Sequence, residues 1–206
     1  RIATVARRAG YDVQIVDSPF AGWSQEHSLV KVDQGHLIRY GLTDTQIREI
    51  IETAQPDIVG IQCNYTVQWG NARALAELVK TLDPNLVLVT GGAHSSGDWK
   101  NALLDSAFDF ALINEADRAF TLLLDALTHE GTDINAVPGV AYRDSRAQLI
   151  RPTQKSSYLS IIPKRQDLEE RLGVMPLPDF SFLNMNHYLQ PYHSSGARVR
   201  KHGAWA

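Results

Sequence analysis

The sequence predicts an α/β domain with a doubly wound parallel sheet of the Rossmann-like or flavodoxin-like kind. Three apolar runs support this prediction, at 58–63, 86–90 and 108–113, and each is followed by polar or glycine-rich residues. Continuous apolar runs separated by helical patterns are typical of strands buried on both faces of a parallel sheet. Open sheets of this kind bind ligands beyond the carboxyl ends of their strands. We therefore expect functional residues directly after these three runs.

The first forty residues predict a helix, a strand and a long connection. Ile2, Val5, Ala6 and Ala9 form an apolar stripe at helical spacing, and residues 11–16 alternate as a strand would. Residues 20–40 resemble an irregular loop. Since a parallel α/β sheet normally begins with a strand before its first helix, we expect a first strand upstream of Arg1, and a chain truncated at both ends.

The rest of the chain predicts further helices and then a change of pattern. Thr43 and Gln46 have the spacing of a capping box at a helix start, and apolar stripes predict helices at 71–82, 99–106 and 116–129. Residues 139–143 and 148–151 predict a small hairpin, and 152–206 an irregular linker. We expect a Rossmann-like domain over 1–136, with the hairpin and linker in 137–206.

Composition limits the classes of function. The chain has 206 residues, 44% of them hydrophobic and 21% charged, with a net charge of −3, which is ordinary for a globular protein and gives no basic field for nucleic acid or membrane lipid. No apolar run reaches the roughly 18 residues of a membrane span. The single cysteine, Cys63, excludes an internal disulfide framework, fits a reducing cytoplasm, and excludes an iron–sulfur site within these residues.

Amides and hydroxyls follow the run at 58–63. The candidate ligand-binding residues are Asn64, Tyr65, Thr66 and Gln68. These side chains suit an uncharged, amide-rich ligand better than a phosphate. The alternative is that Asn64 or Thr66 only caps the next helix.

A glycine pair follows the run at 86–90. Gly91 and Gly92 permit positive φ and allow a bulky ligand to approach the backbone; we expect a bulky residue at Gly92 to abolish ligand binding and spare the fold. The alternative is a simple strand-to-helix turn. The dinucleotide fingerprint G-x-G-x-x-G is absent. His94, next to the pair, could hydrogen-bond a ligand amide or phosphate, or only cap a turn at the surface.

Carboxylates follow two predicted strands. Asp17 follows the strand at 11–16 and Glu115 follows the run at 108–113. Carboxylates at such positions often hold ribose hydroxyls, although either residue could only cap a helix. Nothing in the sequence places the two within reach for acid–base chemistry, and the histidines lack metal-ligand spacing. We therefore predict neither catalytic residues nor a metal site in this chain.

Several segments, in order and spacing, resemble the N-terminal cobalamin-binding domain of cobalamin-dependent radical SAM enzymes of the methyltransferase type. Gly91-Gly92-Ala93-His94 is similar to the family's Gly-Gly-x-His, and Asn114-Glu115-Ala116-Asp117 stands where the family usually has Gly-Glu-Gly-Glu. Asn114 and Asp117 thus depart from the family pattern. The other similar segments are 1–13, 41–47, 56–61, 139–143 and 175–180, the last of which is like the family's Leu-Pro-x-Pro linker.

The resemblance implies a Rossmann-like domain that binds cobalamin with its nucleotide tail extended into the protein. It places the tail beside Gly91, Gly92 and Glu115, and the rim of the site near Asp17 and Ser18. The residues implied to face the corrin amides are Asn64, Tyr65, Thr66 and Gln68.

The resemblance also implies a larger enzyme. The family's three-cysteine motif does not occur in these 206 residues. A C-terminal radical SAM domain of the same chain would bind a [4Fe-4S] cluster and S-adenosylmethionine, and the whole protein would methylate an unactivated carbon. These residues alone would bind cobalamin without being catalytic.

Two other readings remain open at this point. One is a flavodoxin-like ligand-binding or signalling domain without cobalamin, which leaves 64–68 and the long segment 137–206 unexplained. The other is a nucleotide-sugar-binding half-domain, which would require phosphate contacts at Gly91 and Gly92 rather than amide contacts.

Overall fold

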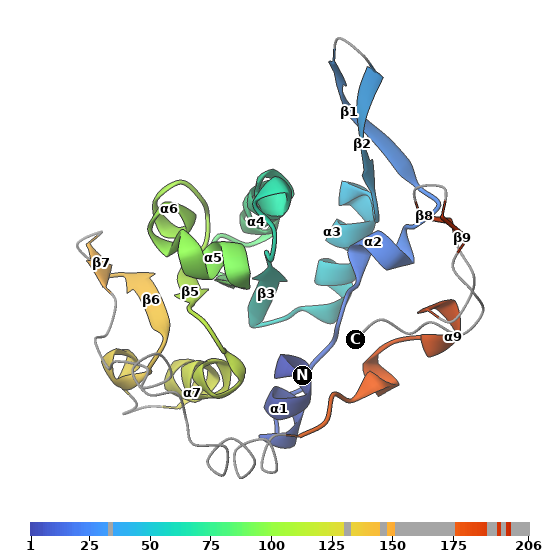
Figure 1. Ribbon diagram of the computed structural model, residues 1–206. Helices are drawn as coiled ribbons and strands as arrows, with labels where there is room; N and C mark the ends of the chain where they lie inside the picture. Colours follow the sequence, from blue (N-terminus) through green and yellow to red (C-terminus); the bar gives the residue numbers. More distant parts are fainter. Residues whose placement is uncertain are drawn as a thin grey trace.

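The computed structural model describes residues 1–32, 35–129, 133–144, 148–150, 176–188, 193–194 and 197–198. Its centre is a five-stranded sheet in the order β3-β4-β5-β6-β7 (Figure 1). The first three strands, β3 (Ile58–Gln62), β4 (Val87–Gly91) and β5 (Phe110–Leu112), are parallel. The other two, β6 (Val140–Arg143) and β7 (Leu149–Ile150), are antiparallel. The predicted α/β class with a parallel-containing sheet is confirmed.

Helices cover both faces of this sheet. Helices α4 (Trp69–Leu82) and α6 (Trp99–Leu104) pack on the face where Leu88 and Ile113 are buried. Helix α7 (Asp117–Thr128) packs on the other face, over Val89 and Leu112. Neighbouring residues of one strand point to opposite faces of the sheet, and both faces are covered by helices. The strands are therefore apolar throughout their length.

Two more helices flank these layers. Helix α1 (Ile2–Arg8) contacts α7, and α3 (Asp44–Ala54) contacts α4. The predicted capping box is present at the start of α3: the Gln46 amide donates to Thr43 Oγ1 over 3.1 Å, and the Thr43 amide donates to Gln46 Oε1 over 2.9 Å. These two bonds satisfy backbone donors that the first helical turn leaves without a partner.

The predicted strand at 11–16 is wrong. These residues pair with no strand in the described part of the chain, and β3, at the end of the sheet, pairs only with β4 there. A strand exists only where a neighbour takes up its backbone hydrogen bonds, and alternation cannot supply the neighbour. This segment is held by a side chain instead: the Tyr11 hydroxyl donates to Asp125 Oδ1 of α7 over 2.6 Å. The pKa of Tyr11 is raised, mainly by burial and also by this hydrogen bond to Asp125.

The predicted irregular loop at 20–40 is also wrong. Helix α2 (Ser18–Ala21) is followed by β1 (Glu26–Val32) and β2 (Gly35–Tyr40), which form an antiparallel hairpin that projects from the body of the molecule (Figure 1). Its register pairs Glu26 with Tyr40 and Val32 with Gly35. The sequence did contain a signal, since two runs of strand-forming residues flank the polar pair Asp33-Gln34 and Gly35.

The predicted hairpin after residue 137 is confirmed, and it extends the main sheet because β6 pairs with β5. Short elements complete the described part: α5 (Ala93–Gly97), η1 (Thr66–Gln68), η2 (Ile134–Ala136), η3 (Phe180–Phe182), α9 (Met185–Tyr188), β8 (His193–Ser194) and β9 (Ala197–Arg198). Most of the predicted linker, including 151–175, lies outside the described residues. The domain boundary at 136 stays a prediction.

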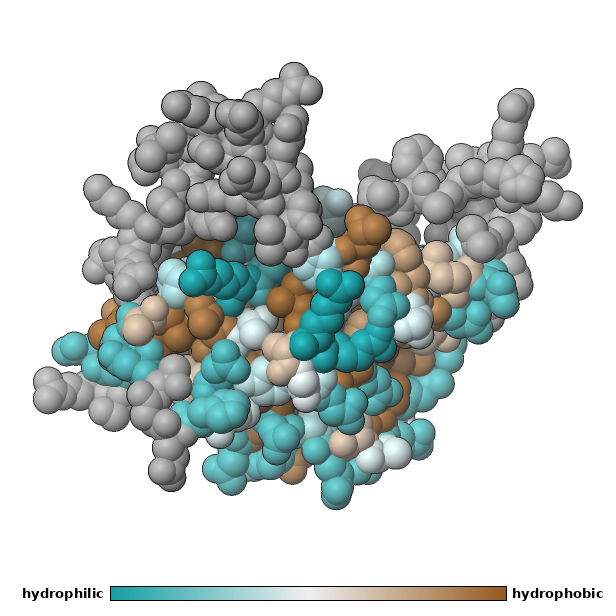
Figure 2. Space-filling view, turned by 90° about the horizontal axis from the view of Figure 1, so that it is seen from below, coloured by the Kyte–Doolittle hydropathy of each residue, from teal (hydrophilic) through white to brown (hydrophobic). Residues whose placement is uncertain are grey.

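The described helices are all too short or too polar to cross a lipid bilayer. On the face seen from below, hydrophilic and hydrophobic residues are interspersed over the described surface (Figure 2).

Candidate functional site

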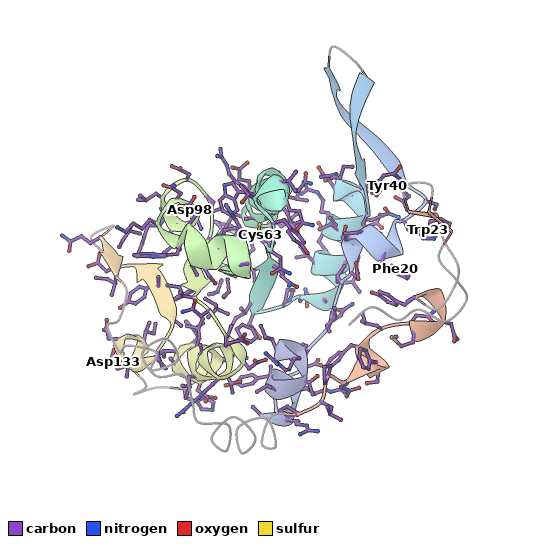
Figure 3. The ribbon with its side chains drawn as sticks, in the orientation of Figure 1. Phe20, Trp23, Tyr40, Cys63, Asp98 and Asp133 are labelled. Atoms are coloured by element: carbon purple, nitrogen blue, oxygen red, sulfur yellow. The ribbon has the colours of Figure 1, made fainter. Side chains whose placement is uncertain are left out.

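The carboxyl ends of β3, β4 and β5 lie side by side. Gln62 at the end of β3 is paired with Gly91 at the end of β4, and the Cys63 amide donates to the Gly91 carbonyl over 2.7 Å. Cys63 lies just past the end of β3 (Figure 3). It is fully buried, and burial raises the pKa of its thiol, so it is an unreactive part of the core. The segments predicted to bind a ligand therefore begin at one edge of the sheet.

Gly92 brings two of these segments together. It has φ 111° and ψ 177°, and a Cβ atom there would lie 2.5 Å from the Cys63 carbonyl oxygen and 2.6 Å from Asn64 Oδ1. Only glycine adopts this conformation readily. The expectation that a larger residue at Gly92 would spare the fold is therefore wrong, because the close approach at this position is made by the protein's own backbone.

His94 meets the segment that follows β3. Its Nδ1 atom is hydrogen-bonded to Thr66 Oγ1 over 3.2 Å, and its ring lies 5.1 Å, centroid to centroid, from the Trp69 ring. Beside this pair, Tyr65 is 66% exposed and Val67 is 88% exposed. The structure thus places polar and apolar side chains together at the carboxyl edge.

Three hydroxyls that the sequence reading missed hold α5 against this edge. The buried Ser95 Oγ and Thr90 Oγ1 are hydrogen-bonded to each other over 2.8 Å. Thr90 Oγ1 also donates to the Ile61 carbonyl over 3.2 Å. Ser96 Oγ donates to the Gly92 carbonyl over 2.8 Å and accepts from the Asn114 amide over 2.9 Å. The Thr90–Ser95 pair could have been identified from the sequence, because Thr90 ends a buried apolar run and Ser95 follows it five residues later.

Replacing Thr90 with valine should destabilise this arrangement. Thr90→Val keeps the side-chain shape but leaves the buried Ser95 hydroxyl without the Thr90 oxygen, and a buried polar group that loses its partner costs about 1–3 kcal/mol. We expect the free energy of unfolding in urea to fall by that amount. Thr53→Val, at an exposed position of α3, is the control and should change it by less than about 0.5 kcal/mol. Equal stability of the two variants would contradict the anchoring role.

Asn114, Glu115 and Asp117 follow β5, and Arg1 binds the two carboxylates. Arg1 Nη2 lies 2.8 Å from Glu115 Oε2 and 2.8 Å from Asp117 Oδ2. The hydrogen bond to Asp117 raises the pKa of Arg1 above its ordinary value. Asp117 is buried, whereas the Glu115 side chain is 68% exposed. Asn114 has φ 64°, so it occupies the left-handed region that glycine favours and asparagine tolerates. This conformation explains why asparagine can replace the glycine of the family pattern.

Asp17 and Ser18 lie away from the ends of β3, β4 and β5. Both belong to the region of α2, beside α3 (Figure 1). Asp17 Oδ1 accepts from the Phe20 amide over 3.2 Å and so caps α2, while Ser18 Oγ accepts from the Leu42 amide over 3.2 Å. Among the described contacts, their roles are structural, and the predicted role of these two residues at the rim stays a prediction.

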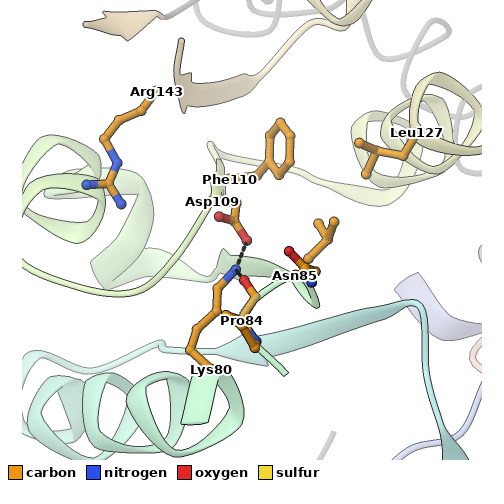
Figure 4. A pocket seen from close by; sticks show the side chains of 8 residues that line it. Lys80, Pro84, Asn85, Asp109, Phe110, Leu127 and Arg143 are labelled. Atoms are coloured by element: carbon orange, nitrogen blue, oxygen red, sulfur yellow. Dashed lines mark hydrogen bonds and ion pairs between the residues drawn. The ribbon is translucent and has the colours of Figure 1, made fainter. Parts of the chain in front are cut away.

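A pocket of about 390 Å³ lies at the opposite, amino-terminal edge of the sheet (Figure 4). Its charged residues are Lys80, Asp109 and Arg143. Lys80 Nζ lies 2.8 Å from Asp109 Oδ2 and also donates to the carbonyls of Pro84 and Leu86. All three donors of this lysine are therefore used within the protein. None of the predicted site residues lines this pocket.

The described residues contain no group of three or more histidine, cysteine, aspartate or glutamate side chains that could hold a metal ion. The predicted site residues at the carboxyl edge offer amides, hydroxyls, one imidazole and the exposed Glu115 carboxylate.

Known proteins share this sequence pattern. The chain is 28% identical over 213 residues to cytidylyl-2-hydroxyethylphosphonate methyltransferase of Streptomyces wedmorensis, covering 96% of this chain and 39% of the relative. It is 29% identical over 102 residues to the cobalamin-dependent radical SAM methyltransferase TokK of Streptomyces tokunonensis, covering 49% of this chain and 15% of the relative. The chain thus spans well under half the length of these relatives.

A solved structure shares the fold. The radical S-adenosylmethionine methyltransferase TsrM from Kitasatospora setae, with cobalamin and a [4Fe-4S] cluster bound, matches with a TM-score of 0.55 at 18% identity, over 73% of this chain and 26% of that one. The family model of the B12 binding domain matches residues 1–124, which is more than half of the chain. The chain therefore belongs to the B12-binding domain family, whose members bind cobalamin.

Proposed function

We propose that this B12-binding domain holds cobalamin over the carboxyl ends of β3, β4 and β5, as the cofactor-binding part of a radical SAM methyltransferase. The observation that carries this placement is the turn at Gly92, which packs closely against Cys63 and Asn64 and so brings the residues after β3 and the start of α5 to one edge of the sheet. Open α/β sheets bind ligands at this edge.

The side chains at this edge suit a corrin. Asn64, Thr66 and Gln68 are exposed and offer amide and hydroxyl groups, which can pair with the amide groups that fringe the macrocycle. Tyr65 and Val67 offer exposed apolar surface beside them, which a large ring would cover. None of the residues 64–68 or 91–94 is a lysine or arginine, so these segments offer no lysine or arginine to a phosphate group.

The nucleotide tail would enter between β4 and β5. A Cβ atom at Gly91 would make only an ordinary contact with the Leu112 side chain, at 3.6 Å, so the protein's own packing does not require glycine there and a close approach by the ligand would explain it. Glu115, held by Arg1 and largely exposed, would accept hydrogen bonds from ribose hydroxyls. In this assignment His94 is a hydrogen-bonding group for the cofactor, already oriented by Thr66 and Trp69.

We infer the activity of the whole protein from its relatives. Cobalamin would supply the methyl-carrying cobalt, and this domain would bind and orient it. A C-terminal radical SAM domain of the same chain would hold a [4Fe-4S] cluster and S-adenosylmethionine. Solved structures of TsrM contain such a cluster and an analogue of S-adenosylmethionine, and TokK is likewise a radical SAM methyltransferase. The protein would work in the cytoplasm. The family match gives no support to a flavodoxin-like domain without cobalamin.

Titration with hydroxocobalamin tests the site. The chain should shift the visible absorbance of the cofactor, and Asn64→Ala and Thr66→Val should each weaken the affinity roughly three- to tenfold, the worth of one hydrogen bond. Asn85→Ala, at the opposite edge of the sheet, is the matched control and should leave the affinity unchanged. An unchanged spectrum with the unaltered chain would overturn the proposal.

A further inference from the structure

We propose that residues 176–188, named here the strap, dock on α1 and α2, and that Tyr188 positions Asp17 through a hydrogen bond. The sequence predicts this region to be a linker, but three of its hydrogen bonds join it to residues 171 to 175 positions away. The role assigned to Tyr188 rests on the proposed cobalamin site, whose predicted rim includes Asp17, whereas the docking does not depend on it.

Arg7 of α1 makes three different contacts with the strap. Its guanidinium forms an ion pair with Asp179. Nη2 donates to Ser181 Oγ over 3.1 Å, and the guanidinium carbon lies 3.9 Å from the centroid of the Phe182 ring. An exposed ion pair alone adds little stability. Here the same side chain also makes a hydrogen bond and a cation–π contact, and the three contacts together hold the strap in one position on α1.

A buried hydroxyl adds a specific anchor. Thr4 is 4% exposed, and its Oγ1 accepts from the Asp179 amide over 2.9 Å. Asp179 Oδ1 accepts in turn from the Ser181 amide over 2.8 Å and caps η3. The strap therefore forms a turn at Asp179, and the Asp179 amide donates to Thr4 of α1. A freely moving linker would not provide a fixed donor for a buried threonine.

The far end of the strap contacts α2. The rings of Phe20 and Tyr188 are stacked, with centroids 3.8 Å apart and planes 3° from parallel. The Tyr188 hydroxyl donates to Asp17 Oδ2 over 2.5 Å. Phe20 lies on the side of α2 that faces α9 (Figure 3).

These contacts fix the Asp17 carboxylate at both oxygens. Oδ1 caps α2 by accepting from the Phe20 amide, and Oδ2 accepts from Tyr188. The strap contacts both α1 and α2, and α1 packs on α7, which covers the main sheet. The strap therefore connects α2 to the main sheet in addition to the chain segment that joins α1 to α2. Tyr188 would thus act on the cofactor through Asp17, as a positioning residue.

Amide hydrogen exchange tests the docking without any cofactor. Arg7→Gln should raise the exchange rate of the Asp179 amide, followed by NMR, about five- to tenfold, because the strap undocks more often. Arg8→Gln removes the same charge from the neighbouring position of α1 and should leave that rate unchanged. Equal rates in the two variants would overturn the docking.

Affinity for hydroxocobalamin tests the role of Tyr188. Tyr188→Phe keeps the stacked ring and removes the hydroxyl, and it should weaken binding about threefold or more. The double variant Tyr188→Phe with Asp17→Asn should bind as Asp17→Asn does, because one change already removes the interaction. Tyr142→Phe, which loses a hydroxyl bond to Asn135 elsewhere, is the control.

Additive losses in the double variant, or no loss in Tyr188→Phe, would overturn the positioning role. Failure of the unaltered chain to bind hydroxocobalamin would overturn the proposed function and this role with it. The exchange experiment, made without cobalamin, would then still decide whether the strap docks.

Discussion

Gly92→Ala is expected to lower the free energy of unfolding by about 3 kcal/mol or more and to abolish cobalamin binding. The conformation of Gly92, φ 111° and ψ 177°, costs a residue with a side chain about 1–3 kcal/mol. The added methyl group would also lie 2.5 Å from the Cys63 carbonyl oxygen, so the strand ends must separate. Urea denaturation and a hydroxocobalamin titration of the same preparation measure both effects.

Gly70→Ala is the control for this variant. Gly70 lies near the start of α4, where a Cβ atom would have nothing within 4 Å, so alanine should stabilise the protein by up to about 1 kcal/mol through its helix propensity. The two substitutions are chemically identical and have opposite expected signs. If Gly92→Ala unfolded at the same urea concentration as the unaltered chain, the close approach of the two backbones would be refuted.

Gly22→Ala is expected to be the next most damaging change. A Cβ atom at this buried position would lie 2.2 Å from the Gly41 carbonyl carbon and 2.5 Å from the Leu42 amide nitrogen. Backbone cannot yield as a flexible side chain does, and overpacking typically costs about 1–3 kcal/mol. The Leu42 amide would also lose its bonds to Ser18, so α2 should shift. We expect the urea midpoint to fall and the affinity for hydroxocobalamin to weaken.

Gly97→Ala provides the comparison. Gly97 ends α5, and a Cβ atom there would have nothing within 4 Å. Its urea midpoint and cobalamin affinity should match those of the unaltered chain within error. A Gly22→Ala variant as stable as Gly97→Ala would show that α2 and 41–42 are not in close contact.

The main sheet and most of the candidate site were predictable from local patterns. Long apolar runs predict buried strands because both faces of a parallel sheet are covered, and the polar residues that follow such runs must then meet at one edge. The structure accordingly brings together the residues after β3 and β4, from Asn64 to Thr66 and from Gly91 to His94.

The first forty residues were predicted less well, for one physical reason. Residues 11–16 alternate but pair with no described strand, whereas 26–32 and 35–40 pair with each other. Pairing is a property of two segments, and a pattern read along one segment does not show whether a partner lies beside it. The role of Gly92 was misjudged for the same reason, since its crowding comes from residues 63–64 across the sheet edge.

Sequence alone determined the fold class, the edge at which a ligand should bind, and the likeness to cobalamin-binding domains, because these depend on periodicity and on short motifs. Only the tertiary structure decided which hydroxyls anchor α5, why asparagine is tolerated at Asn114, and how the strap reaches Thr4, Arg7 and Asp17. These features depend on atoms that lie far apart in the chain, and packing brings them within hydrogen-bonding distance.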